Sequence, residues 1–397
     1  MSPAIRTFVA YRLVSRGYFH LSVLFIFLLH AGHSVLSVAV VLASYGLAMA
    51  ALTPVTPKLV ARLGPGRALM SGELGKAAGL LLLAFGADHL GLAVLAQVIN
   101  ALGFALAISA DAGVLNQIAE PARVRELQAS TQSLMFLALL VSGVAGGALY
   151  EVAPRWPIVA GAIAALAAAG IAGVLARSTR APAAGRGSAP RAVKRVAPEE
   201  VRWITYYVMT RGYMLGTFIG LMPFLIFSKL GASVFTLTLY LAAYTLAAFV
   251  TARYAHQILE RAGVVRFAAV TAVVLLLALV IFAESSSTAV VVLALVLLGA
   301  ASGCVRPATM AQLTAASQRF RGTPAPGWLL SRMEGLFGIC NALVVLCGGA
   351  MISHWSFATA MLVLCLSYVL LQTAAELYAR RHNVPADHDD QSLGLPA

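Results

Sequence analysis

The sequence predicts an all-α integral membrane protein, with twelve transmembrane helices arranged as two pseudo-symmetric bundles of six. Three observations predict this fold. Hydrophobic residues make up 60% of the 397 residues and charged residues only 11%, whereas a soluble protein has about 25% charged residues. Apolar runs of about 20 residues, long enough to cross a bilayer as a helix, recur along the chain. The second half of the chain also repeats features of the first.

Each long apolar run is expected to be a helix, because a helix satisfies its own backbone hydrogen bonds in lipid. The spans predicted for the first half are residues 7–30, 34–56, 68–87, 90–113, 127–150 and 156–176. Those predicted for the second half are residues 202–228, 233–253, 265–284, 288–312, 328–352 and 355–378. The first run has no small-residue cleavage site after it, so we expect it to be retained as a span.

The domain organisation follows from these spans. Residues 1–176 and 202–380 are predicted to form the two six-helix bundles. The segment 177–201 between them is rich in Arg, Ala, Pro, Gly and Ser, which is typical of a flexible linker. Residues 381–397 are predicted to be a disordered cytoplasmic tail.

Lysine and arginine are distributed unevenly between the loops. One set of loops, together with the linker, carries nearly all of them, whereas the opposite set carries only Arg155 and Lys229. The positive-inside rule therefore predicts a multi-pass protein of the cytoplasmic (inner) membrane, with both termini in the cytoplasm. Topology thus explains the net charge of +13. Nucleic acid is not expected as a partner, because the basic residues form no patch with interleaved aromatics.

The two halves carry matching residues at nearly constant spacing. Ser15-Arg16-Gly17-Tyr18 in the first span is almost repeated as Thr210-Arg211-Gly212-Tyr213 in the seventh, an offset of 195. Further pairs share an offset of 199: Ser34 with Ser233, Tyr45 with Tyr244, Arg62 with Arg261, Gly64 with Gly263, and Arg67 with Arg266. Such a parallel repeat predicts two bundles related by an axis along the membrane normal.

A loop signature appears after spans 2 and 8. Its residues are Arg62, Gly64 and Arg67 in the first copy, and Glu260, Arg261, Gly263 and Arg266 in the second. With six plus six spans and a basic central loop, this pattern resembles the major facilitator superfamily, whose signature is Gly-x-Leu-Ala-Asp-Arg-x-Gly-Arg-Arg. The acidic position of that signature is Ala61 in the first copy and Glu260 in the second.

The resemblance implies a transporter rather than an enzyme, with spans 1, 4, 7 and 10 lining a central cavity. Two other family motifs are degenerate here. The antiporter signature Gly-Pro-x-x-Gly-Gly appears as residues 142–147, Ser-Gly-Val-Ala-Gly-Gly, without its proline. The span 4 arginine of many proton-coupled members is replaced by Gln97, which Asn100 follows. The N-terminal half is nevertheless similar to efflux members that export drugs or natural products.

The charged residues of the cavity-lining spans are candidates for a substrate site. Arg16 and His20 are four residues apart, so a continuous helix would place them on one face. With Arg211 opposite, they would form a basic clamp for a carboxylate or phosphate, which the planar guanidinium binds bidentately. The alternative is that both arginines brace helix ends by binding carbonyls or acids. The candidate substrate-binding residues are Arg16, Tyr18, His20, Asn100, Arg211, Tyr213 and Arg306.

The remaining embedded charges leave several alternatives. Asp111, Glu334 and His20 are candidate proton carriers. Asp111 either pairs with Arg306 across the two halves as a gate, or each finds a local partner. Glu334 forms a static pair with Arg332 or is a protonation site. Two simpler expectations are that Glu73 and Lys76 neutralise each other on span 3, and that Arg12 reaches the cytoplasmic surface. The repeated tyrosines Tyr18, Tyr213, Tyr45 and Tyr244 either line the cavity or only pack.

Together these features predict a secondary active transporter that works by alternating access. Proton-coupled export of a small anionic or amphipathic molecule, such as a drug, a siderophore-like compound or another secreted metabolite, is the preferred interpretation. Proton-coupled uptake of an organic anion and flipping of a lysolipid are the alternatives. No Gly-x-x-x-x-Gly-Lys-Ser/Thr loop is present, so the energy is expected to come from an ion gradient, with protons preferred, or from the substrate's own gradient. We expect no cofactor and no metal, and a monomer whose partners are substrate, protons and the lipid bilayer.

Overall fold

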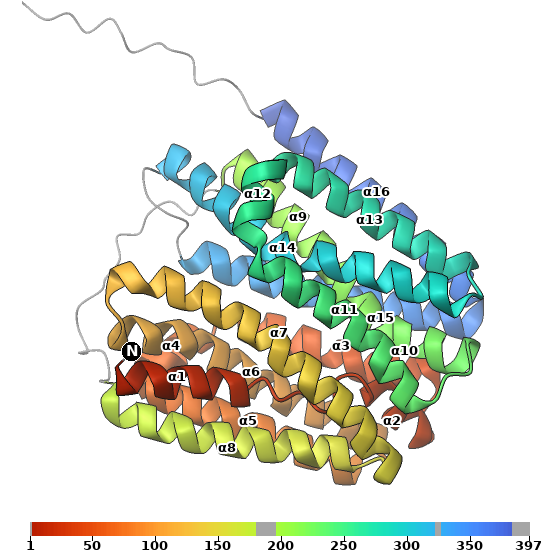
Figure 1. Cartoon of the computed structure of the whole chain (residues 1–397), viewed down its shortest axis with the longest axis horizontal. Coiled ribbons are helices and arrows are strands. Elements are labelled where there is room, and N and C mark those ends of the chain that lie inside the picture. The colour runs from red at the N-terminus through yellow and green to blue at the C-terminus, as the bar shows by residue number, and fades with distance from the viewer. Residues whose placement is uncertain (1, 180–195, 322–326, 383–397) are drawn as a thin grey trace, which may run out of the picture.

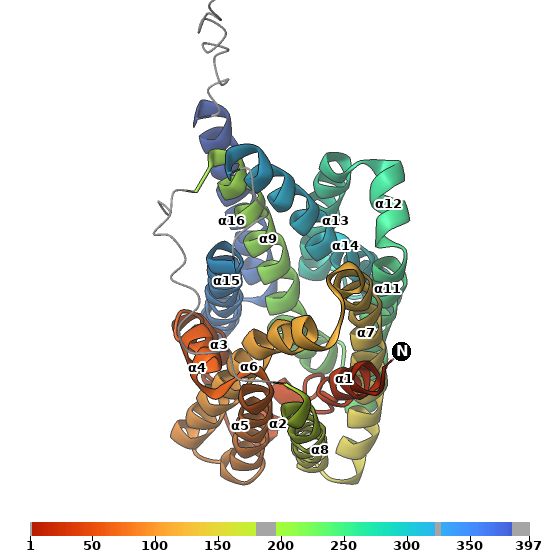
Figure 2. The ribbon, with the colours of Figure 1, turned by 90° about the vertical axis from the view of Figure 1, so that its left-hand side faces the viewer.

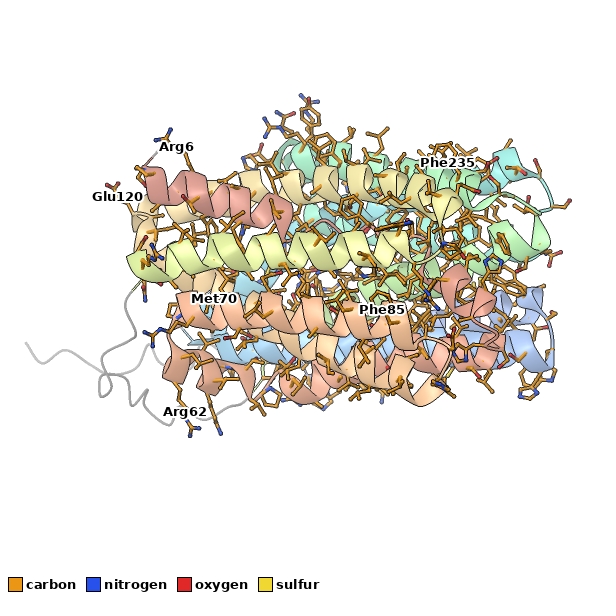
Figure 3. The ribbon with its side chains drawn as sticks, turned by 90° about the horizontal axis from the view of Figure 1, so that it is seen from below. Arg6, Arg62, Met70, Phe85, Glu120 and Phe235 are labelled. Atoms are coloured by element: carbon orange, nitrogen blue, oxygen red, sulfur yellow. The ribbon has the colours of Figure 1, made fainter. Side chains whose placement is uncertain are left out.

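A computed structural model describes residues 2–179, 196–321 and 327–382. The part of the chain that it describes contains helices and no strands. Most of the predicted linker and nearly all of the predicted C-terminal tail lie outside the described residues. Both termini of the described chain lie at the end that carries the basic loops, called here the basic end (Figure 1). Arg6 and Arg62 mark this end, and Phe235 lies toward the opposite end (Figure 3).

The helices match the predicted spans. The first half contains α1 (Pro3–Val14), α2 (Leu24–His30), α3 (Val35–Leu52), α4 (Thr56–Leu63), α5 (Pro65–Gly86), α6 (Leu90–Ile118), α7 (Pro121–Val152) and α8 (Trp156–Ser178). The second contains α9 (Pro198–Gly216), η1 (Thr217–Leu221), α10 (Met222–Phe224), η2 (Leu225–Lys229), α11 (Val234–Arg253), α12 (Ala255–Ala262), α13 (Val264–Glu284), α14 (Thr288–Arg321), α15 (Gly327–His354) and α16 (Phe357–His382). Eleven helical stretches among the described residues are long and apolar enough to cross a membrane. The broken first span supplies the twelfth, so the predicted fold is confirmed.

The first span is interrupted, although the sequence predicts one continuous helix over residues 7–30. Helix α1 ends at Val14, and the chain passes through turns before α2 begins at Leu24. The Ser15 carbonyl accepts a hydrogen bond from the Lys76 ammonium, 3.0 Å away. A side chain of α5 thereby satisfies a backbone group that the break leaves outside the helix.

The seventh span stays helical but changes its pitch. Helix α9 continues into two short π-helical segments, η1 and η2, on either side of α10. Pro223 lies between them and has no backbone N–H to donate. Spans 1 and 7 therefore both depart from regular α-helix, the first at residues 15–23 and the seventh at residues 217–229. Such π-helical turns are rare and tend to mark functional sites.

Two short helices occupy the loops that carry the signature residues. Helix α4 ends at Gly64, whose φ is +80°, and α12 ends at Gly263, whose φ is +75°. Only glycine adopts this left-handed region without strain. The equivalent geometry explains why these two glycines occupy the same place in both halves. Ser34 and Ser233 likewise cap the N-termini of α3 and α11 in the same way.

The two halves meet along two pairs of helices, α3 with α15 and α7 with α11, which Figure 2 shows on either side of the bundle. At the end opposite the basic loops, further aromatic contacts join α2 to the seventh span. The ring centroids of Phe25 and Phe224 lie 6.4 Å apart, and those of His30 and Phe227 lie 5.7 Å apart. The Glu151 carboxylate of α7 also accepts a hydrogen bond of 3.1 Å from the Phe235 amide of α11. The halves are therefore closed against each other at this end.

The contact between α3 and α15 depends on small residues. A Cβ atom added to Gly46 would lie 2.6 Å from the Gly338 carbonyl oxygen and 3.0 Å from the Ala342 methyl group. We expect Gly46→Ala to destabilise the protein by about 1–3 kcal/mol through overpacking. Gly170→Ala is the matched control, because nothing lies within 4 Å of its added Cβ. Thermal unfolding of both variants in lipid nanodiscs measures the effect, and equal melting temperatures would contradict the close contact.

Candidate substrate site

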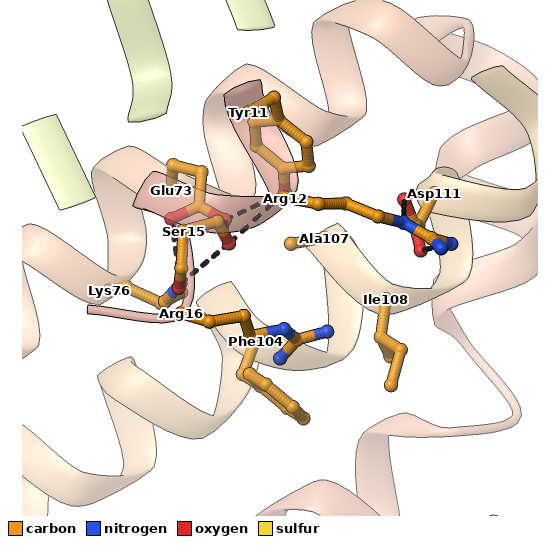
Figure 4. A pocket seen from close by; sticks show the side chains of 10 residues that line it. All are labelled: Tyr11, Arg12, Ser15, Arg16, Glu73, Lys76, Phe104, Ala107, Ile108 and Asp111. Carbon is orange, nitrogen blue, oxygen red and sulfur yellow. Dashed lines mark hydrogen bonds and ion pairs between the residues drawn. The ribbon is translucent and has the colours of Figure 1, made fainter. Parts of the chain in front are cut away.

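Arg16 lies in the break of the first span and faces two aromatic rings. Its guanidinium carbon is 5.8 Å from the centre of the Tyr18 ring and 5.2 Å from that of Phe104 on α6. It also donates a 2.5 Å hydrogen bond to the Tyr18 hydroxyl. Arg16 lines a hollow with Phe104, Ile108 and Asp111 (Figure 4). Within the described chain, no carboxylate forms an ion pair with it.

Arg211 on α9 also faces a tyrosine and a phenylalanine in the second half, although these rings come from other positions of the repeat than Tyr18 and Phe104. Its guanidinium carbon lies 5.3 Å from the centre of the Tyr207 ring and 4.9 Å from that of Phe337 on α15. It donates a hydrogen bond to the Tyr207 hydroxyl, one helical turn earlier. Arg211 also has no ion-pair partner among the residues that the structure describes. Each half therefore places one arginine against aromatic rings, and neither arginine forms an ion pair with a carboxylate of the described residues.

Asp111 is bound within its own half. Both of its carboxylate oxygens accept hydrogen bonds from Arg12, through Nε at 3.1 Å and through a terminal nitrogen. Arg12 is buried and also binds the Thr131 hydroxyl. The expectation that Arg12 reaches the surface is therefore wrong, because Asp111 provides a closer counter-ion. Of the two alternatives for Asp111, local pairing is the one observed.

Glu334 on α15 is bound by two residues of the second half. It accepts a 2.9 Å hydrogen bond from the Tyr207 hydroxyl, and Arg306 of α14 lies 3.5 Å away. The expected static pair with Arg332 does not form; the Arg332 side chain is exposed. The Tyr207 hydroxyl thus joins Glu334 to Arg211. This chain of contacts connects a carboxylate, which is 27% exposed, to the arginine of the candidate site.

Glu73 and Lys76 form the expected pair on α5, with 2.7 Å between the ammonium and the carboxylate. Both side chains are buried. Glu73 also accepts hydrogen bonds from the Tyr11 hydroxyl at 2.8 Å and the Ser15 hydroxyl at 2.7 Å (Figure 4). The pair therefore does more than neutralise itself, because it also binds Tyr11 and Ser15 at the C-terminal end of α1.

Three of the predicted substrate residues are placed in contacts between helices. His20 is buried beside Gly161 of α8, since the break removes the regular spacing that would have aligned it with Arg16. Asn100 packs closely against Gly79 of α5. Tyr213 shares a 2.7 Å hydrogen bond with Ser367 of α16. By contrast, Tyr18 lies beside Arg16, and Arg306 lies beside Glu334.

Sequence reasoning missed Phe104, Tyr207 and Phe337, the rings against the arginines. Tyr207 precedes Arg211 by four residues and so shares its helix face, which is a signal that the sequence contains. Phe104 and Phe337 come from other helices, and no local pattern marks them.

The signature arginines of the loops lie on the surface. Arg62, Arg67, Arg261 and Arg266 are all exposed. Glu260 approaches His256 of its own helix, at 3.2 Å. The structure therefore places these residues at the basic end, away from Arg16 and Arg211.

Comparison with known proteins identifies the family. The sequence model of the major facilitator superfamily matches residues 7–324. The chain belongs to the major facilitator superfamily. No curated protein matches it in sequence. Membership makes the chain a multi-pass membrane protein of a transporter family, with a small molecule as substrate.

Solved structures of several transporters share the fold at low identity. The human organic anion transporter MFSD10 (TETRAN) has a TM-score of 0.66 and 13% identity, covering 94% of this chain and 100% of its own. The nucleoside transporter NupG has a TM-score of 0.72 and 13% identity, covering 95% and 99%. An auto-inhibited peptide transporter of the POT family has a TM-score of 0.73 and 13% identity, covering 100% and 99%. At such identity the likeness establishes the fold alone.

Proposed function

We propose that this chain is a proton-coupled exporter of a small anionic or amphipathic molecule, whose anionic part binds to Arg16 and Arg211. One observation carries the proposal. Each half holds a repeat-related arginine that is partly buried, lies against aromatic rings and forms no ion pair in the described chain. An unpaired charge at this depth is costly, so an anionic ligand that neutralises it gains binding energy.

The proposed transport cycle is alternating access, with both termini in the cytoplasm and the protein in the cytoplasmic membrane. The contacts of α2 with the seventh span would close the outer side while substrate enters from the basic end. Closing the basic end and separating these contacts would then release the substrate outside. Rocking of two repeat-related bundles about a central site is the expected movement.

Glu334 is our candidate for the proton site. Asp111 is held bidentately by Arg12, and Glu73 is enclosed by Lys76, Tyr11 and Ser15. The ion pair of Glu334 with Arg306 is longer than those of Asp111 and Glu73, and the Glu334 side chain is partly exposed to solvent. Protonation would weaken the attraction of Glu334 for Arg306. It would also weaken the hydrogen bond that Glu334 accepts from the Tyr207 hydroxyl, which itself accepts a hydrogen bond from Arg211. Proton binding at Glu334 would thereby change the electrostatics of the arginine that holds the substrate.

Thermal unfolding tests the anion preference. Purified protein in nanodiscs would be heated with a panel of carboxylates, phosphate esters, amines and neutral amides of similar size. We expect anions to raise the apparent melting temperature, because a ligand that binds only the folded state stabilises it. Stabilisation by amines or amides alone would contradict the proposed function.

Proteoliposomes of defined orientation test the direction and the coupling. The anion that stabilises most in the panel would be followed with an imposed pH gradient of either sign. Movement against the proton flow supports export by antiport. Movement with the proton flow supports uptake instead, and translocation of an anionic lysolipid alone would support lipid flipping.

We expect Glu334→Gln to separate substrate exchange from proton coupling. The amide keeps the size of the side chain but cannot lose a proton, so substrate exchange should continue while a pH gradient no longer drives accumulation. Glu376→Gln is the control, because Glu376 pairs with Arg202 and Arg380 far along α16. Unchanged pH-driven accumulation in Glu334→Gln would remove Glu334 as the proton site.

A further inference from the structure

We propose that the substrate carries two anionic groups, one bound by Arg16 and the other by Arg211, on either side of an apolar and preferably aromatic body. The inference rests on the proposed function and narrows its substrate from an anionic molecule to a dianion. Aromatic dicarboxylates are the simplest members of this class. The charges of the spans, their repeat symmetry and the rings beside each arginine carry the argument.

The charges of the spans leave two cations without counter-ions. With the spans bounded as in the structure, and the broken first span taken from Pro3 to His30, five cations and three carboxylates of the described chain lie about two helical turns or more from both ends. Three ion pairs use every carboxylate: Arg12 with Asp111, Lys76 with Glu73, and Arg306 with Glu334. The two cations that remain are Arg16 and Arg211. A monoanion would compensate one of them, whereas a dianion compensates both.

Symmetry places the two arginines on opposite sides of the centre. Arg16 is thirteen residues beyond Pro3, which begins α1, and Arg211 is thirteen residues beyond Pro198, which begins α9. Repeats related by an axis along the membrane normal put equivalent residues at the same depth in opposite halves. A ligand that contacts both arginines therefore spans the interface between the halves.

A second hollow between the halves is mainly apolar and partly aromatic. Tyr18, Ser22 and Leu139 of the first half and Phe218, Leu241 and Thr245 of the second are among the residues that line it, and neither arginine does. With Phe104 and Phe337 beside the two guanidinium groups, the surroundings favour a planar body that can pack against rings. Across the interface, the aromatic body of the ligand would then lie between the two protein cations, Arg16 and Arg211.

Binding of three matched compounds tests the dianion. Terephthalate, benzoate and terephthalamide share one ring and carry two, one and no anionic groups. Their affinities for the full chain in nanodiscs would be measured by calorimetry. We expect terephthalate to bind at least about tenfold more tightly than benzoate, because a charge-assisted hydrogen-bonded contact contributes about 1.5–3 kcal/mol. Arg16→Gln and Arg211→Gln should each remove this preference, and Arg380→Gln should keep it.

Each other outcome overturns the dianion assignment. Equal affinities for terephthalate and benzoate, both lost in Arg211→Gln, would overturn it while leaving the proposed anion site intact. Preferential binding of terephthalamide would overturn both proposals. Binding of none of the three would overturn the dianion assignment, and the wider thermal panel would then decide the proposed function separately. A preference that survives in both glutamine variants would also overturn it.

Discussion

Arg211→Ala is expected to abolish transport while leaving the protein folded and inserted. The substitution removes a cation that neutralises no carboxylate in the described chain, and Glu334 keeps Arg306 and Tyr207 as partners. Stability should therefore change little. Substrate affinity should fall by about tenfold to a hundredfold, the range for losing one charge-assisted contact. Transport rates of reconstituted protein, measured with the most stabilising anion of the panel, check this expectation.

Arg16→Ala should have the same effect, because Arg16 also lies against two aromatic rings and forms no ion pair in the described chain. Arg380→Ala is the matched control: Arg380 is exposed and pairs with Glu376 at the end of α16. Its loss should leave transport unchanged. The clamp interpretation fails if both central variants transport at the wild-type rate. If either variant loses its folded state instead, the arginine braces the helices, which is the alternative that the sequence left open.

The fold could be predicted because the bilayer leaves the chain few choices. Long apolar runs must form helices in lipid, and the basic loops mark the ends of the spans. The break at residues 15–23 could not be predicted in this way, since it depends on a contact outside the span. At the break, Lys76 of α5 binds the Ser15 carbonyl, which has left its helix. The sequence shows a lysine on the third span, but not which backbone group it reaches.

The candidate site could be predicted only in part, for a similar reason. The repeat identifies Arg16 and Arg211 as equivalent, since aligning the halves requires no tertiary information. Helical periodicity relates residues on one element, such as Tyr207 and Arg211. It does not show that Arg12 is closer to Asp111 than Arg306 is, nor that Phe337 approaches Arg211. Those neighbours depend on how the helices are rotated against each other.

The buried pair on α5 should dominate the stability of the first half. We expect Lys76→Met to destabilise the folded protein by about 3–5 kcal/mol, because it leaves the buried Glu73 carboxylate without its counter-ion. The substitution also removes the donor that satisfies the Ser15 carbonyl at the helix break. Reversible unfolding in denaturant or thermal unfolding in nanodiscs measures the effect.

A double-mutant cycle separates the charge from the helix break. Glu73→Gln removes the carboxylate, so in the double variant Glu73→Gln/Lys76→Met no unpaired charge is left buried. If the ion pair carries the stabilisation, the double variant should recover most of the loss, since coupling of adjacent residues makes their effects non-additive. If the hydrogen bond to Ser15 matters as well, part of the loss should remain in every variant that lacks Lys76. Additive losses across the cycle would mean that the two side chains act independently, and the ion pair would then not carry the stabilisation.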